Sequence, residues 1–186
     1  MDDETRLQLS LDMLKEVIER DTEIPLKTFG LSMRPAICGG EWIVVRRVAE
    51  GEVQVGDIIV YQAGGKFVAH RIIRRLEKGG QTCFRVKGDA QLSSEGVLPA
   101  GQIVARVVAL KKKGREIDMD QTTWRRVNRI IAHYSSAIDR IFRCLHYRPD
   151  RTGLVGRLLT AAVRLPPRLL MLAWEFSTKN SRQIEN

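Results

Sequence analysis

The sequence predicts a mainly β domain that is preceded by one helix and followed by a helical extension. Three observations carry this prediction: an apolar helical repeat in residues 3–20, short β-rich runs between residues 24 and 110, and a return to helical spacing from residue 121. The expected divisions are therefore residues 1–22, 23–112 and 113–186. With 186 residues, the chain has room for one packed core and an appendage.

The first segment has the pattern of an amphipathic helix. Its apolar residues recur three or four positions apart, with acidic and basic residues between them. This spacing predicts a helix over residues 3–20, with an apolar face made of Leu7, Leu11, Leu14 and Ile18.

The central segment consists of short β-rich runs separated by glycine-rich turns, with Gly64-Gly65 and Gly79-Gly80 as hairpin loops. Many short strands of this kind are typical of a β-barrel or of two packed sheets. The expected strands are Ile24–Phe29, Trp42–Val48, Asp57–Tyr61, Phe67–Arg74, Thr82–Lys87 and Ile103–Leu110.

The last segment is basic and helical. Residues 111–186 hold 16 basic and 7 acidic residues, which accounts for the whole net charge of +9. Helices are expected over 121–147 and 154–176, and residues 121–176 are a candidate surface for an anionic membrane or a partner protein. The alternative is that 154–176 packs on the β domain. Nucleic-acid binding is not expected, since no recognised motif accompanies the charge. The apolar residues expected to face inward in the first helix are Val127, Ile130, Ile131, Tyr134, Ile138, Ile141, Phe142 and Leu145.

The three cysteines and the N-terminal residues bear on the compartment. The sequence has three cysteines, an odd number, and no Cys-x-x-Cys pair, which argues against a disulfide framework and a structural zinc site. They are Cys38, Cys83 and Cys144.

The chain starts with acidic residues, whereas a secretory signal has a basic start followed by an apolar run. The sequence also has no uncharged apolar run long enough to span a membrane. These patterns predict a cytoplasmic protein, with peripheral membrane association through the basic extension as an option.

Ser32 lies where the chain leaves the first expected strand, in Gly30-Leu31-Ser32-Met33-Arg34-Pro35. A turn between a glycine and a proline exposes the hydroxyl and frees nearby backbone N–H groups from strand pairing. Acyl transfer needs such a hydroxyl, together with donors for the developing oxyanion. The alternative interpretation is an ordinary turn serine.

His70 lies inside an expected strand, where alternation places it on one face with Val68 and Ile72. Apolar neighbours desolvate the imidazole, which keeps it neutral and able to act as a base. The alternative is a core or edge histidine with a purely structural role. The other two histidines, His133 and His146, fall in the basic extension and are expected at a surface or interface.

Asp89 follows a glycine at the end of an expected strand, so its carboxylate can reach a neighbouring strand and hold an imidazole in one tautomer. The Gly-Asp pair is also favourable for an Asx turn, and Asp57 in Gly56-Asp57 has the same local chemistry. From these residues alone, the partner of His70 stays open.

Four short motifs follow one another in the β segment, and their order is more specific than any one motif. Gly-x-Ser-Met-x-Pro, Gly-Asp-Ile-Ile-Val-Tyr, His-Arg-Ile and Lys-Gly-Asp follow one another between Phe29 and Leu110. This series resembles the signal peptidase I superfamily, which includes the LexA-like repressors. The resemblance implies a signal-peptidase/LexA-like β-barrel or packed-sheet domain. A histidine before the arginine resembles the endoplasmic-reticulum and archaeal branch of signal peptidases, in which histidine replaces the lysine base.

The resemblance implies Ser32 as the nucleophile, His70 as the base and Asp89 as the family's acidic residue, with no metal or organic cofactor. Glu95 falls where that branch has a further aspartate. The other box residues, Met33, Pro35 and Arg71, are expected to have secondary or substrate-binding roles. The implied substrate is a leader-like or signal-like peptide segment, bound as an extended strand.

Two other functions remain open at this stage. The first alternative is that the β domain is a catalytically silent binding or regulatory module, as the resemblance to LexA-like repressors implies. The retained serine, histidine and aspartate favour the peptidase, because a binding module needs none of them. A membrane-surface or scaffold protein acting through the basic extension is the third possibility.

Overall fold

The computed structural model describes residues 12–13, 16–18, 20, 23–112 and 114–144. The strands are β1 (Ile24–Lys27), β2 (Trp42–Arg46), β3 (Ile58–Ala63), β4 (Lys66–Lys78), β5 (Gln81–Lys87), β6 (Gly96–Pro99), β7 (Ile103–Lys112) and β8 (Arg115–Asp118). Two 3₁₀ turns, η1 (Glu50–Glu52) and η2 (Ala100–Gln102), and the helix α2 (Thr122–Cys144) complete the described elements. The predicted mainly β fold is confirmed.

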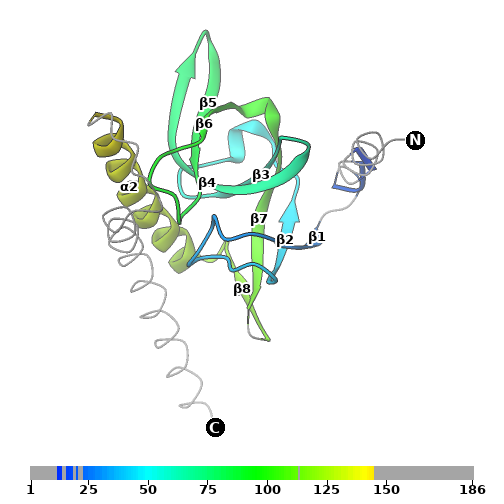
Figure 1. Cartoon of the computed structure of the whole chain (residues 1–186). Coiled ribbons are helices and arrows are strands. Elements are labelled where there is room, and N and C mark those ends of the chain that lie inside the picture. Colours follow the sequence, from blue (N-terminus) through cyan, green and yellow to red (C-terminus); the bar gives the residue numbers. More distant parts are fainter. Residues whose placement is uncertain (1–11, 14–15, 19, 21–22, 113, 145–186) are drawn as a thin grey trace.

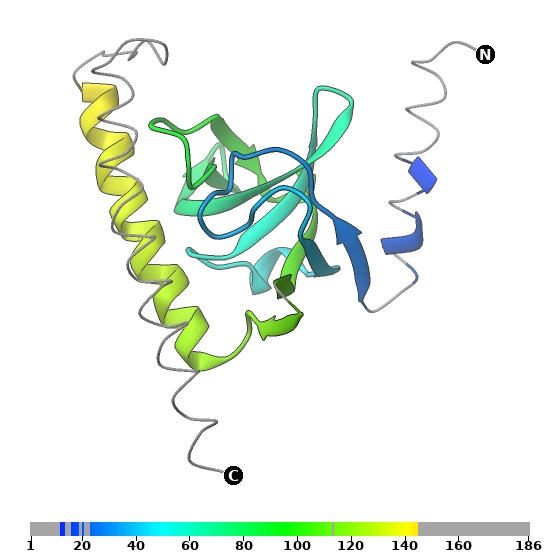
Figure 2. The same ribbon diagram turned by 60° about the horizontal axis from the view of Figure 1, so that its bottom comes forward.

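All strand pairs are antiparallel, and the sheet has the order β1-β2-β7-β3-β4-β5-β6, with β8 added beside β7. The sheet curls on itself, and α2 lies along the side opposite β1 and β2 (Figures 1 and 2). An extra residue, Ile73, interrupts the register of β4 with β5, so that Ile72 and Ile73 are both buried.

The core consists of two main clusters, which lie on opposite faces of β3. One cluster lies between β1, β2, β3 and β7, and it extends to Trp124 of α2 and to Ile18. Its buried members are Ile18, Ile24, Met33, Ala36, Ile37, Ile43, Val45, Ile58, Val60, Ala105, Val107, Leu110, Ile117, Met119 and Trp124. The second joins β3, β4, β5 and β6 through Val53, Ile59, Tyr61, Ile72, Phe84, Val86, Leu98 and Ala100.

The N-terminal segment agrees with the expected helix where it is described. Residues 12–13, 16–18 and 20 are helical, and Ile18 is 1% exposed within the core. The other residues of its expected apolar face, Leu7, Leu11 and Leu14, lie outside the described residues, as does the expected helix 154–176.

The sheet continues beyond the boundary expected at residue 112. β8 pairs with β7 over Ala109↔Asp118 to Lys112↔Arg115, so the helical extension starts at Thr122. The four residues of β8 are mostly charged, and therefore lack the apolar alternation that marks a strand. β6 was also not predicted, because four residues ending in proline carry little strand signal.

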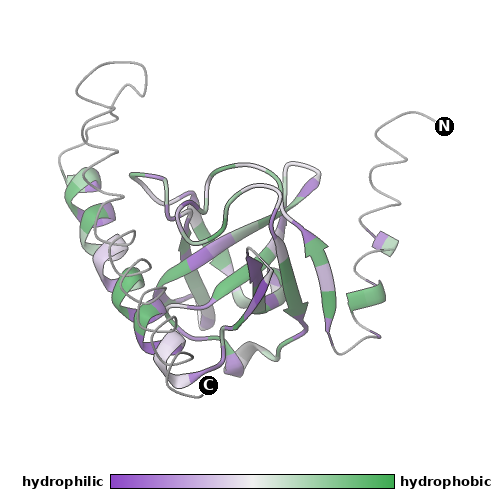
Figure 3. Cartoon of the chain, turned by 90° about the horizontal axis from the view of Figure 1, so that it is seen from below, coloured by the Kyte–Doolittle hydropathy of each residue, from purple (hydrophilic) through white to green (hydrophobic). Residues whose placement is uncertain are grey.

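The helix expected over 121–147 is α2, but its buried face differs from the predicted one. Ile131 and Phe142 are buried, whereas Ile130 and Ile141 are 53% and 52% exposed, and Leu145 lies outside the described residues. Polar residues fix the helix's rotation, because hydrogen bonds from the β domain hold Asn128 and Asp139 inward. Hydrophilic and hydrophobic residues consequently alternate along α2 (Figure 3).

Gly56 lets α2 approach the sheet closely. Its φ of +105° favours glycine, and a Cβ there would lie 3.0 Å from the backbone nitrogen of Arg129. Among the described residues, no helix has both the length and the apolar composition that a bilayer-spanning segment requires.

Candidate active site

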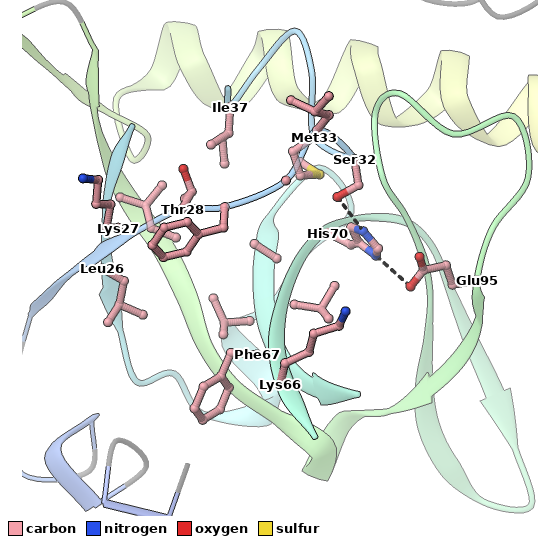
Figure 4. A pocket seen from close by; sticks show the side chains of 17 residues that line it. Leu26, Lys27, Thr28, Ser32, Met33, Ile37, Lys66, Phe67, His70 and Glu95 are labelled. Atoms are coloured by element: carbon pink, nitrogen blue, oxygen red, sulfur yellow. Dashed lines mark hydrogen bonds and ion pairs between the residues drawn. The ribbon is translucent and has the colours of Figure 1, made fainter. Parts of the chain in front are cut away.

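A pocket of about 560 Å³ lies between two chain segments that are far apart in the sequence. Residues 26–33 run along one side, and residues 66–70 of β4 run along the other. Ser32, His70 and Glu95 meet at one end, which Figure 4 shows from close by. The sequence-predicted serine and histidine, 38 positions apart, are therefore brought together.

The loop that carries Ser32 is held by backbone contacts. The amide of Ala90 donates to the carbonyl oxygen of Ser32 at 2.8 Å. A Cβ on Gly88 would lie only 2.6 Å from that same oxygen, so the loop of residues 88–90 requires glycine at this point. Within the described chain, no backbone carbonyl accepts from the N–H of Ser32, which leaves this donor available.

His70 is a buried imidazole directed at the serine. It is 1% exposed, and its Nε2 lies 3.2 Å from the Oγ of Ser32. Burial lowers the pKa of His70 below its ordinary 6.5, although the Glu95 and Asp89 charges oppose this shift. The ring is therefore neutral near pH 7, as a general base must be.

Tyr61 and Glu95 hold the other side of the ring. The hydroxyl of Tyr61 lies 3.0 Å from Nδ1 of His70 and donates at 3.0 Å to Oε2 of Glu95, which itself lies 3.1 Å from Nδ1. Burial, and then the Glu95 charge, raise the pKa of Tyr61, so its hydroxyl keeps its proton at neutral pH. Two acceptors around Nδ1 place the ring proton there and leave Nε2 free to accept from the serine.

Asp89, one of the acids left open as the partner of His70, binds Arg71 instead. Both of its carboxylate oxygens accept hydrogen bonds from Arg71 at 2.8 Å, and the two side chains are 0–1% exposed. Arg71 also donates to the carbonyl of Gly56 at 2.9 Å and to Asn128 of α2 at 2.8 Å. Asp89 therefore neutralises a buried arginine that ties the sheet to α2, whereas Glu95 lies against the imidazole.

The remaining predicted residues fall at different distances from the reacting atoms. Met33 is 5% exposed and lines the pocket, but Pro35 does not line it and instead accepts from Lys112 at 3.3 Å. Asp57 accepts from the amide of Gln54 at 2.8 Å and takes no part in the site. Burial raises the pKa of Asp57.

Sequence reasoning missed Tyr61, although a usable signal was present. The Gly64-Gly65 hairpin sets the register of β3 on β4, in which Tyr61 faces Val68 and Ile59 faces His70. Tyr61 and His70 are thus diagonal neighbours on one face of the sheet, where long side chains can touch. Working out this hairpin register would have placed the tyrosine beside the base.

Lys87 is a second buried cation near the site. It is 1% exposed, and its Nζ has no hydrogen-bond partner among the described residues. Burial lowers its pKa to about 8, against the opposing effect of the Asp89 charge. Lys87 in turn contributes to the lowered pKa of His70.

Comparison with known proteins identifies the family. Residues 2–108, more than half of the chain, match the family described as peptidase S24-like. The chain belongs to this family. It is also 36% identical over 72 residues to the signal peptidase complex catalytic subunit sec11 of Neurospora crassa, a match that covers 37% of this chain and 42% of that protein. These findings confirm the signal peptidase superfamily and support a signal-peptidase-like serine peptidase in general terms.

Proposed function

We propose that this chain is a serine endopeptidase in which Ser32 attacks the scissile carbonyl and His70 acts as the general base. The observation that carries the proposal is the 3.2 Å contact between the serine Oγ and Nε2 of a buried, neutral imidazole. Such a contact is within the reach that general-base catalysis needs.

Each step of the proposed reaction has a group in place. Nε2 of His70 accepts the Ser32 proton while Oγ bonds to the peptide carbon, and the free amide of Ser32 donates to the oxyanion. The imidazolium is stabilised at Nδ1 by Glu95 and Tyr61. His70 then protonates the leaving amine, and water that it deprotonates hydrolyses the acyl-enzyme. The reaction requires no metal or organic cofactor.

The substrate is proposed to bind as an extended strand in the pocket. Residues 66–70 pair with β3 on one side and with no described strand on the other, since β5 joins β4 only from Arg71 onward. Among the described strands, β1 likewise pairs only with β2. Two unpaired edges thus flank the pocket that ends at Ser32, which is the arrangement that suits an added peptide strand.

We further propose that the peptidase acts in the cytoplasm or at the inner face of a membrane, on a leader-like or signal-like segment. The reason for the cytoplasmic side is the odd number of cysteines, three, without a Cys-x-x-Cys pair. The sec11 relative is named as a signal peptidase subunit, which makes a signal-like segment the natural substrate class to test.

The test is covalent labelling with a fluorophosphonate probe, read as an increase in intact mass. Wild type should gain one adduct, Ser32→Ala none, and His70→Ala should react at least about a hundredfold more slowly. Ser136→Ala and His133→Ala, which alter α2 instead, serve as matched controls. A folded wild type that gains no adduct at any pH would contradict the proposal and favour a silent binding module.

The pH dependence gives a second check. The labelling rate should rise with pH as His70 loses its proton, with a midpoint below 6.5, because burial lowers the pKa of the imidazole. Glu95→Gln removes a charge that raises this pKa, so the midpoint should move further down while the plateau rate falls. A Glu95→Gln midpoint above that of wild type would contradict the assignment of Glu95 to Nδ1.

A further inference from the structure

The floor of the pocket is apolar and continuous with the hydrophobic core. Met33, Ile37, Ile43 and Val60 line it and are themselves members of the first core cluster. Leu26, Phe67 and Ala69 pack against the same cluster and form its walls. A cavity of about 560 Å³ with such a lining favours bulky apolar groups, since a small side chain would leave much of it to water.

The rim of the pocket is positive. Lys27 and Lys66 line it, and the one lining acid, Glu95, is already engaged by Tyr61, His70 and Gln91. Lys66 is exposed, and no described residue forms an ion pair with it. Its ammonium end points along the pocket toward His70 and Glu95 (Figure 4).

We propose that this pocket selects peptide segments that combine a bulky apolar side chain with a nearby carboxylate, and that Lys66 determines the preference for the acid. This proposal rests on the proposed peptidase function, and names its substrate class. The apolar side chain lies on the floor, and the carboxylate pairs with the Lys66 ammonium.

The position of the carboxylate follows from strand geometry. Lys66 and His70 share one face of β4 and are separated by about 13 Å along the strand, at roughly 3.3 Å per residue. Because the lysine side chain leans back toward His70, the acid lies about two to four residues from the scissile bond.

The experiment measures peptide affinity on the full-length Ser32→Ala chain, so that binding is read without cleavage. Labelled peptides carry leucine or alanine in the central position and glutamate or lysine about three residues to either side. The glutamate is expected to reach Lys66 from only one of the two sides. For the peptide with glutamate on that side, fluorescence anisotropy should show about two- to fivefold tighter binding than for the peptide with lysine there. Replacing the leucine by alanine should weaken binding about tenfold.

Lys66→Glu, added to Ser32→Ala, should invert the charge preference while leaving the leucine preference in place. Lys78→Glu serves as the matched control, because Lys78 is an exposed lysine at the far end of the same strand. Equal affinity for glutamate and lysine peptides on either side would overturn the proposal, as would the same inversion by Lys78→Glu. Fluorophosphonate labelling of wild type distinguishes the proposed peptidase function from the proposed substrate preference. If wild type is labelled but shows no peptide preference, the substrate preference is refuted and the peptidase function is not.

Discussion

Replacing Arg71 by methionine leaves the Asp89 carboxylate buried without a partner. Arg71 donates four hydrogen bonds at 2.8–2.9 Å, two of them to Asp89, and both side chains are 0–1% exposed. Removing one member of such a buried pair costs about 3–5 kcal/mol. We therefore predict that Arg71→Met lowers the free energy of unfolding by that amount, and that Asp89→Leu does so to a similar degree.

The double variant, Arg71→Met with Asp89→Leu, should cost clearly less than the sum of the two single changes, because neither member of the pair is left buried without the other. A remaining loss of about 1–3 kcal/mol is expected, since the Gly56 carbonyl and Asn128 lose a donor.

Urea unfolding followed by tryptophan fluorescence measures these differences, with Trp124 as a core reporter at 1% exposure. Single changes below about 1 kcal/mol, or a double change equal to the sum, would refute the idea that the pair acts as a buried neutral unit.

Substitutions of Asp89 and Glu95 distinguish an acid that stabilises the fold from an acid that acts on His70. If Asp89 acts through Arg71, the folded fraction of Asp89→Asn should label at close to the wild-type rate. Glu95→Gln, in contrast, should label slowly although it stays folded, because Glu95 is partly exposed and contacts Nδ1 of His70. The reverse order of the two rates would assign Asp89 to the imidazole.

Three further predictions concern other parts of the fold. Gly88→Ala should slow labelling more than tenfold, because its Cβ would collide with the Ser32 carbonyl, whereas the open Gly51→Ala should label normally; equal rates in mass spectrometry would contradict the packing. Lys87→Met should raise the unfolding free energy near pH 7 by about 1–3 kcal/mol. It should also abolish the gain in stability from pH 8 to pH 10.5, because the wild-type amine has a lower pKa folded than unfolded; unchanged urea curves would contradict this. Finally, the full chain should sediment with anionic but not neutral vesicles, and Ile130→Asp should reduce this binding; equal sedimentation with both would contradict the electrostatic attraction, and sedimentation with neither would argue for a protein partner.

The order of the sequence boxes was sufficient to predict the pairing of Ser32 with His70, which the structure places within hydrogen-bonding distance. The identity of the acid was harder. Register pairs Arg71 with Lys87, and Arg71 points away from the face of His70, so a residue just beyond Lys87 meets the arginine first. Once the strand pairing is known, alternation places Asp89 on the same face as Arg71; without the pairing, alternation does not identify the partner of Asp89.

The parts that resisted prediction share a physical cause. β6 and β8 are four-residue strands with one buried apolar side chain each, Leu98 and Ile117, which is too few for an alternating pattern to mark them. The rotation of α2 is set by the buried polar residues Asn128 and Asp139, whose partners lie in the β domain. A rule that places apolar residues inside cannot anticipate such partners.

The unpaired edge of residues 66–70 should bind the backbone of nearly any extended peptide equally well, because its backbone groups pair with backbone groups of the peptide. It distinguishes one kind of residue only: proline, which brings no N–H to a ladder. A peptide with proline at a position that pairs with this edge forms one hydrogen bond fewer, however well its side chains fit the floor of the pocket. A proline scan of any bound peptide would therefore map the footprint of the edge, one residue at a time.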